Sequence, residues 1–248
     1  MKQYFRTIIR GVRARKEQKR LIQKRGCWLD VVKWDACKLI YITMPKTANT
    51  SIKTSISRAT GILDQGDEAA LAQDPQKIHG ILRSKHEVTL NIEDISSYPD
   101  YFVFSTVRNP MDRFISFYKD KVLGGGWGEA KTAEILNTYG ISLESSNEKN
   151  ISKICSFSDQ LSEIHFRSQY GVLSHHGRYL PHAVFRFEQM DLMWDILRAY
   201  MSQQGVALPS SQEHINKSSG SKRPEWLTPE IEAMIQARHA KDFRFFGY

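Results

Sequence analysis

Two short segments of the chain combine cations and hydroxyl groups in a pattern that suits anion binding. The first runs from Pro45 to Ser51 and follows an apolar run. The second begins at Arg108, directly after the apolar run 101–107, and extends to Ser116. Each lies where a strand is expected to give way to a helix. Two such turns in one chain suggest a ligand with two separated anionic ends.

The first turn offers the groups of a phosphate or sulfate cradle. Its residues are Pro45, Lys46, Thr47, Ala48, Asn49, Thr50 and Ser51. A helix N-terminus presents backbone N–H groups to an anion, the lysine adds a cation, and two or three hydroxyls are at hand. The glycines and the terminal Gly-Lys-Ser/Thr of a Walker A loop are missing. An ordinary strand-to-helix turn with a surface lysine would have the same residues.

The second turn places Arg108 eight residues before Ser116. If the chain reverses at Asn109-Pro110, the helix packs back along the strand and both side chains can reach one anion. An arginine fork with a hydroxyl suits a terminal phosphate. The alternative is that Arg108 and Arg113 pair with an acid of the core, and the spacing alone leaves both open.

The pattern of apolar residues predicts an α/β fold with a central parallel sheet flanked by helices. Ligands of such sheets bind at the carboxyl ends of the strands, where both turns lie. The last helix has Thr228 as N-cap and Pro229 at its first position. We expect surface loops at 124–128 and 142–152. Strands are expected at 38–43, 101–107 and 183–187, and helices at 51–58, 111–123, 129–139, 189–201 and 229–240.

Length and composition indicate one domain in a reducing compartment. The chain has 248 residues, 41% of them hydrophobic, which is enough for one substantial core. Its three cysteines are odd in number and lack CxxC spacing, so neither a disulfide framework nor a zinc knuckle is indicated. No apolar run approaches the roughly 18 residues of a membrane span, and no signal peptide is recognisable. We therefore expect a cytoplasmic protein.

The net charge of +8 is concentrated at the N-terminus. Residues 1–25 hold ten Lys or Arg and one acid, a net +9, whereas residues 26–248 are nearly neutral. We divide the chain into this basic arm and one domain at 26–248. Apolar residues of the arm share one helical face, so it could lie on the inner face of an anionic membrane. A solvated or docked helix fits equally. Nucleic acid is not expected, because no basic stripe with interleaved aromatics follows.

Together, the two turns closely resemble the cofactor motifs of the carbohydrate-type (family 2) sulfotransferases, and in particular bacterial cytosolic members. The resemblance continues through Lys85-His86 and four further segments, so it covers roughly residues 38–248. The further segments are 165–169, 185–188, 215–218 and 240–248. The family has a P-loop-like α/β fold and uses 3′-phosphoadenylyl sulfate (PAPS), which leaves as PAP after transfer.

The resemblance implies a role for each motif in cofactor binding. In the family, the first loop holds the 5′-phosphosulfate, which here falls on Pro45 to Ser51. Its second motif holds the 3′-phosphate, which here falls on Arg108 and Ser116. Lys217 and Ser218, in a polar loop before the last helix, are expected to close over the cofactor.

The reaction implied is transfer of a sulfuryl group to a hydroxyl of a carbohydrate or glycolipid acceptor by in-line displacement. Lys46 would stabilise the charge that develops on the leaving side. His86 matches the position of an essential family histidine and is our choice of general base. His165, Arg167 and Gln169 are expected to contact the acceptor. Glu87, Glu93, His79 and His165 are the alternative bases.

The chain departs from the family in several places. Ser168 stands where proline is common, Met111 where tryptophan is frequent, and the hydrophilic stretch 61–78 is idiosyncratic. We expect no metal site, because sulfate esters need no divalent cation and the pair His175-His176 lacks an accompanying carboxylate or cysteine pattern. The alternatives to a sulfotransferase are a non-catalytic PAP- or PAPS-binding protein recruited by its basic arm and a nucleotide-dependent kinase.

Overall fold

The computed structural model describes residues 31–85, 89–209 and 223–248. The basic arm, His86, Lys217 and Ser218 lie outside the described residues, so the predictions that involve them stay predictions. The described residues form two compact units. Residues 31–85, 89–109 and 169–209 make up the first, here called the sheet unit. Residues 110–168 and 223–248 make up the second, the helical unit.

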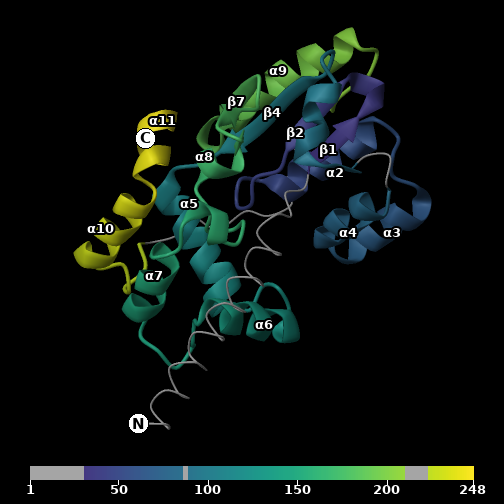
Figure 1. The fold of residues 1–248 in the computed structure, drawn as a ribbon. Coiled ribbons are helices and arrows are strands. Elements are labelled where there is room, and N and C mark those ends of the chain that lie inside the picture. Colours follow the sequence, from purple (N-terminus) through teal and green to yellow (C-terminus); the bar gives the residue numbers. More distant parts are fainter. Residues whose placement is uncertain (1–30, 86–88, 210–222) are drawn as a thin grey trace, which may run out of the picture. The chain divides into compact units, whose positions relative to one another are not determined.

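A mixed five-stranded sheet in the order β3-β1-β2-β4-β7 organises the sheet unit (Figure 1). Its strands β2, β4 and β7 are parallel, whereas β1 is antiparallel to both β2 and β3. The predicted α/β class with a central parallel sheet is confirmed for β2, β4 and β7, and the structure adds the antiparallel strands β1 and β3 at one edge. The 3₁₀ turn Asp35–Cys37 between β1 and β2 is too short for the crossover that parallel strands need. The strands are β1 Val31–Trp34, β2 Leu39–Ile42, β3 Thr89–Leu90, β4 Phe102–Val107 and β7 Ala183–Arg186, beside a hairpin of β5 Ser174–His175 and β6 Arg178–Tyr179.

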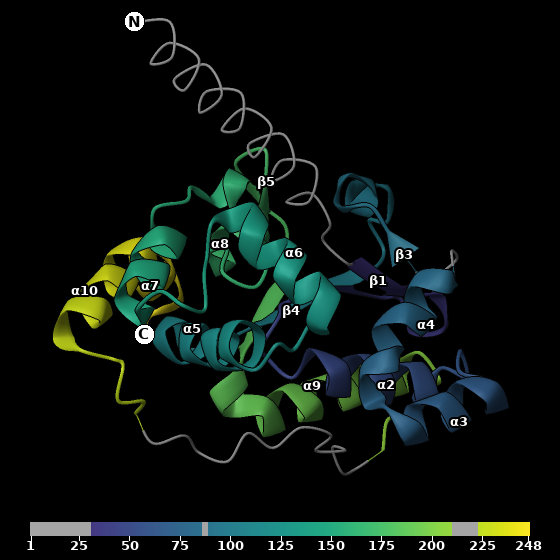
Figure 2. The same cartoon turned by 90° about the horizontal axis from the view of Figure 1, so that it is seen from below.

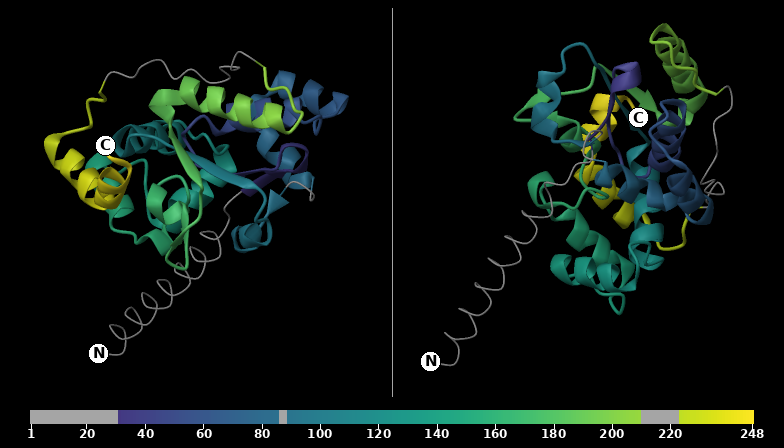
Figure 3. Two further views of the ribbon diagram at one scale, coloured as in Figure 1. Left: turned by 90° about the horizontal axis from the view of Figure 1, so that it is seen from above. Right: turned by 90° about the vertical axis from the view of Figure 1, so that its right-hand side faces the viewer.

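Helices of the sheet unit cover the sheet face that carries Trp34, Tyr41 and Phe104. Ile52 and Ile56 of α2 pack there together with apolar residues of α9, which runs across the strands (Figure 3, left). Helices α3 and α4 lie beside α2 (Figure 2) and add Leu71 of α3 and Ile78 and Leu82 of α4 to the same core. The helices are α2 Asn49–Ala59, α3 Gln65–Gln73, α4 Ile78–Ser84, α8 Gln169–Val172 and α9 Met190–Gln203.

The helical unit has an apolar core of its own, built around Phe114, Phe117 and Tyr118. Helix α10 packs against α5 and α7, and α5 continues into a π-helical turn at Tyr118–Leu123. Burying each large apolar side chain contributes about 1.5–3 kcal/mol, so this core can hold the unit's loops in place. The helices are α5 Pro110–Phe117, α6 Glu129–Tyr139, α7 Asn147–Cys155, α10 Pro229–Arg238 and α11 Ala240–Phe246.

Most predicted elements are confirmed. All three predicted strands and all five predicted helices are present, and Thr228 caps α10 by accepting a hydrogen bond from the N–H of Ile231. The loop at 124–128 is confirmed, but the loop predicted at 142–152 is wrong in its second half, where α7 buries Ile151 and Ile154. None of the helices that the structure describes has the length and apolar character needed to cross a membrane.

Candidate functional site

The first turn forms an uncapped helix N-terminus in the sheet unit. Lys46 and Ala48 have positive φ angles of 71° and 61°, and Ala48, the N-cap of α2, supplies no side-chain hydrogen bond. The first N–H groups of a helix have no acceptor within the helix. Alternating left-handed residues also turn successive N–H groups toward one concavity, which binds anions. The local backbone therefore fits a bound phosphate or sulfate group.

The hydroxyl of Thr47 faces the interior instead of a ligand. Its Oγ1 donates to the carbonyl of Met44 at 2.8 Å and lies 2.6 Å from Oγ1 of Thr106 in β4. The hydroxyl of Tyr41 lies 3.1 Å from the same Thr106 oxygen, and burial raises the pKa of Tyr41 to about 12, so it stays a neutral donor. Thr47 is fully buried. The predicted hydroxyl contact to the cofactor is corrected: Thr47 can contribute its backbone N–H, while its side chain ties the loop to β4.

A histidine of α4 contacts the first turns of α2. His79 Nε2 lies 3.2 Å from Thr50 Oγ1, and His79 Nδ1 lies 3.4 Å from the ammonium of the buried Lys53. A lysine only donates, so Nδ1 accepts and the ring proton is on Nε2, which donates to Thr50. His79 in this tautomer has no lone pair left for a substrate hydroxyl. It therefore orients Thr50 and is a poor candidate for the general base.

The side-chain amide of Gln169 binds both the backbone N–H and the backbone carbonyl of Arg108. The Arg108 N–H donates to Gln169 Oε1 at 2.9 Å, and Gln169 Nε2 donates to the Arg108 carbonyl at 2.8 Å. The guanidinium lies over the Phe187 ring at 4.6 Å, and its Nη1 donates to the carbonyl of Lys46 at 3.5 Å. The sheet unit thus brings Arg108 into contact with the backbone of the loop that carries Lys46.

Two predictions change with this geometry. Gln169 was expected to touch the acceptor, but it is fully buried and both atoms of its amide are used on Arg108. We reassign it to positioning Arg108. Ser116 lies on α5 in the helical unit, and its contact with the 3′-phosphate stays a prediction.

Arg113, the other arginine of the second motif, is part of the helical unit's interior. Its Nη1 donates to the carbonyl of Arg167 at 2.9 Å and its Nη2 to the carbonyl of Ile164 at 3.0 Å. Burial lowers the pKa of Arg113 to about 10, against the opposing effect of nearby carboxylates, chiefly Asp242 and Glu163. The sequence left open whether these arginines bind an anion or pair with an acid of the core, and for Arg113 the structure favours pairing within the core.

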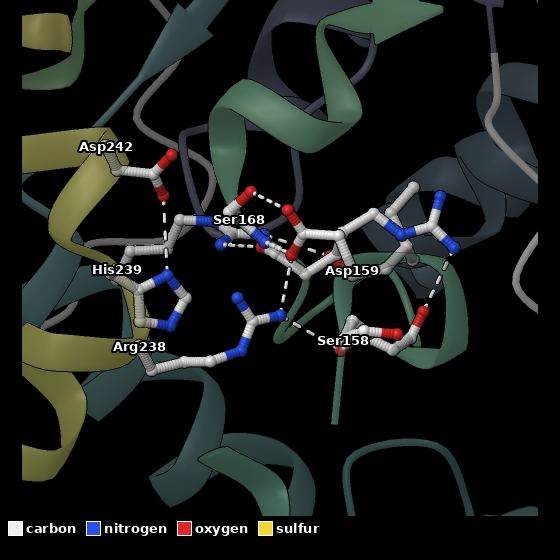
Figure 4. Close-up of polar contacts among 10 residues, drawn as sticks. Ser158, Asp159, Ser168, Arg238, His239 and Asp242 are labelled. Carbon is white, nitrogen blue, oxygen red and sulfur yellow. Dashed lines mark hydrogen bonds and ion pairs between the residues drawn. The ribbon is translucent and has the colours of Figure 1, made fainter. Parts of the chain in front are cut away.

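A second set of contacts fixes the two ends of the segment 159–168 (Figure 4). Asp159 accepts from the N–H of Ser168 at 3.0 Å and from its hydroxyl at 2.5 Å, and Arg238 of α10 donates to Asp159 at 2.6 Å. Burial raises the pKa of Asp159, but the Ser168 and Arg238 hydrogen bonds outweigh it and leave the pKa below its ordinary value. The segment that carries His165 and Arg167 is therefore closed into a loop by charged groups.

Within that loop, His165 is paired with a carboxylate that the sequence analysis did not single out. His165 Nδ1 lies 2.9 and 3.0 Å from the two carboxylate oxygens of Glu163, and the His165 N–H donates to the same carboxylate at 2.7 Å. Arg167 Nη2 donates to the carbonyl of Ser162 at 3.0 Å. His165 and Arg167 share one loop as predicted, and their contact with an acceptor stays a prediction.

The comparison with family models decides the identity of the fold. The model described as the sulfotransferase family matches residues 31–248 in one continuous stretch. The chain belongs to the sulfotransferase family. Searches of the curated proteins and of the solved structures each found no match. Because the match runs through both compact units, the two are parts of one sulfotransferase domain, and sulfuryl transfer is the chemistry that the family performs.

The residues that sequence reasoning missed in this sulfotransferase act behind the predicted ones. Thr106 holds the first loop, and Glu163 pairs with His165. Only Glu163 carried a usable signal, an acid two residues before a candidate histidine. Among the described residues, no group of three or more His, Cys, Asp or Glu is placed to hold a metal ion, and the absence of a metal requirement stays a prediction.

Introducing the common family residue, Ser168→Pro, is expected to destabilise this sulfotransferase by about 1–3 kcal/mol. Proline has no N–H and no hydroxyl, so Asp159 loses two partly buried hydrogen bonds at once. Ser168→Ala removes only the hydroxyl and should cost less. Urea unfolding of the three proteins measures the difference. A Ser168→Pro variant as stable as wild type would show that Asp159 finds other partners.

Proposed function

We propose that the protein transfers the sulfuryl group of PAPS to a hydroxyl of a carbohydrate or glycolipid acceptor. The observation that supports it most strongly is the juxtaposition of two anion-binding elements in the sheet unit. The uncapped N-terminus of α2, with Lys46 beside it, fits the 5′-phosphosulfate. Arg108, whose backbone is locked by Gln169 and whose guanidinium reaches the carbonyl of Lys46, fits the 3′-phosphate.

The chain's own residues supply binding and charge stabilisation in this proposal. When bound, PAPS provides an activated sulfuryl group on a phosphate leaving group. The N–H groups of residues 47–51 and the Lys46 ammonium would stabilise the negative charge on the leaving side. Thr50, held by His79, has its hydroxyl at the first turn of α2. Ser116, Lys217 and Ser218 would complete the cofactor site, and Pro45 fixes the entry to the loop.

The acceptor side of the site rests on different residues. We propose that His165 and Arg167 bind the acceptor and that a histidine takes the proton of its hydroxyl. His86, the base implied by the resemblance, is one candidate. His79 is disfavoured by its contact with Lys53. We further propose that the protein is cytoplasmic and that residues 1–25 act as a basic arm, with the inner membrane face as one binding surface.

The PAP site is tested by comparing the binding of PAP with that of 5′-AMP, which lacks the 3′-phosphate. Wild type should bind PAP more tightly, and Arg108→Met should remove that preference by lowering PAP affinity about 10- to 100-fold, because a charged hydrogen bond is worth about 1.5–3 kcal/mol. Calorimetry or the ligand-dependent melting temperature measures it. Arg178→Met, in an exposed position of the β5–β6 hairpin, is the matched control and should bind like wild type.

Three outcomes separate the proposal from its alternatives. Equal affinity of wild type for PAP and 5′-AMP would contradict the assignment of Arg108. Transfer of ³⁵S from labelled PAPS to a panel of glycans and glycolipids would support catalysis, and PAP binding without labelled product would favour a binding protein. Phosphoryl transfer from ATP that EDTA abolishes would favour a kinase.

A further inference from the structure

The carboxylate of Glu163 is placed to accept a hydrogen bond from Nδ1 of His165. Both carboxylate oxygens lie within 3.0 Å of His165 Nδ1, and one of them also accepts the backbone N–H of His165. Burial raises the pKa of Glu163, but the His165 contacts and the charge of Arg113 outweigh it, so the pKa is below its ordinary value and the group is ionised at neutral pH. An ionised carboxylate only accepts hydrogen bonds, so Nδ1 of His165 carries a proton.

This pairing leaves Nε2 of the neutral His165 ring as the nitrogen with the lone pair. A carboxylate on Nδ1 fixes that tautomer and stabilises the imidazolium formed when Nε2 takes a proton. The His165 side chain keeps 19% of its surface exposed, so a small group can reach it. His79 has the opposite arrangement, since its Nδ1 lone pair faces the Lys53 ammonium.

Aromatic rings hold the His165 ring in place. The Trp127 ring meets it edge-on at 5.5 Å and 87°, and the Phe117 ring lies at 6.5 Å. Trp127 belongs to the loop 124–128, which closes back on the π-helical turn through a hydrogen bond from the Gly126 N–H to the Asp120 carbonyl. A Cβ on Gly126 would lie 2.5 Å from a carboxylate oxygen of Asp120, so this close return needs glycine.

Further charged groups of the helical unit lie near the pair, and Asp159, Arg238 and Asp242 act on Arg113. Arg113 contributes a positive charge near Glu163 and binds the carbonyls of Ile164 and Arg167, on either side of His165. Lys121 lies over the Trp127 ring, with its ammonium 5.8 Å from the ring centre. The carboxylate of Glu163 is in direct contact with the imidazole.

We propose that His165, with Glu163 as its positioning residue, is the proton acceptor for the acceptor hydroxyl. This assignment rests on the proposed sulfuryl transfer and replaces His86 in that role. His165 Nε2 takes the hydroxyl proton while the hydroxyl oxygen bonds to sulfur. The bond between sulfur and the bridging oxygen breaks, its electron pair leaves with PAP, and the proton then passes from His165 to solvent.

The tautomer can be tested without substrate by NMR of the full-length protein labelled with ¹⁵N-histidine. At neutral pH, the His165 ring should show a protonated Nδ1 and an unprotonated Nε2, and the His79 ring should show the reverse. Signals are assigned by loss in His165→Asn and His79→Asn. A protonated Nε2 on neutral His165 would overturn the proposal, because that nitrogen would have no lone pair for the hydroxyl.

The catalytic role is tested with variants that keep the site's shape. With an acceptor that the panel has identified, His165→Asn should lower kcat about 10²- to 10⁴-fold. Imidazole in the buffer should partly restore His165→Ala. Glu163→Gln should lower kcat less than His165→Asn does, and the ¹⁵N spectrum should show a mixture of His165 tautomers, because an amide holds the Nδ1 proton less strongly than a carboxylate. His176→Asn is the matched control, since asparagine tolerates the positive φ of 47° in that exposed hairpin turn.

PAP binding distinguishes the possible failures. The His165 variants should keep the wild-type melting shift with PAP, which shows that the protein is folded and the donor site is intact. Wild type that transfers sulfate while His165→Asn keeps its kcat would overturn the role of His165 alone. Wild type that neither binds PAP nor labels any acceptor would overturn the proposed function itself.

Discussion

Replacing Lys46 with alanine is expected to lower kcat for sulfuryl transfer by about 10²- to 10³-fold, the usual cost of removing one group that stabilises developing charge. Lys46 lies in the loop between β2 and α2, beside the uncapped helix N-terminus. Its charge would act mainly on the leaving oxygen, which gains negative charge as the bond to sulfur breaks. The loss should therefore be much larger in kcat than in the affinity for PAP.

A matched control for this experiment lies at the other end of the same strand. Lys38 also has a positive φ, 52°, and is exposed at the start of β2, away from the carboxyl end where the loop lies. Lys38→Ala therefore imposes the same backbone change without touching the proposed site and should keep wild-type kcat. Steady-state transfer of ³⁵S from PAPS measures both variants. A Lys46→Ala enzyme within threefold of wild type would remove Lys46 from the mechanism.

Local patterns were sufficient to predict the anion-binding turns but not what holds them. The sequence placed Lys46 and Arg108 at two strand ends, and parallel pairing of β2 with β4 brings those ends together. The inward turn of the Thr47 hydroxyl depends on Thr106, which is 59 residues away. The bond from Gln169 to Arg108 spans 61 residues. Such contacts are created by the sheet and have no local signature.

The errors in the fold have a similar origin. Strand β1 was missed because it is only four residues long and includes Lys33, whose charge is balanced by Asp35. Had β1 been recognised, the short connection to β2 would have predicted the antiparallel pair. Helix α7 was missed because its two buried isoleucines stand among polar residues, and tertiary packing rather than propensity stabilises such a helix.

Replacing Arg113 with methionine is expected to destabilise the protein by about 3–5 kcal/mol at pH 7, which is the usual cost of removing one partner from buried charges. The guanidinium is 2% exposed and donates to two carbonyls. Methionine fills similar space but leaves these carbonyls without their donor and the carboxylates of Glu163 and Asp242 without its charge. Urea unfolding measures the loss, with Arg244→Met on the exposed side of α11 as the control.

The pH dependence of that loss identifies its electrostatic part. The pKa of Glu163 is below its ordinary value, and Arg113 is one of the causes. A depressed carboxyl pKa adds stability above the unfolded pKa, near 4.3, and this stability disappears as the pH falls through the folded pKa. The gap between wild type and Arg113→Met should therefore be widest near neutral pH and narrow below about pH 4. A gap that stays constant from pH 7 to pH 3 would mean that Arg113 acts through packing and its carbonyl hydrogen bonds, with no contribution from charge.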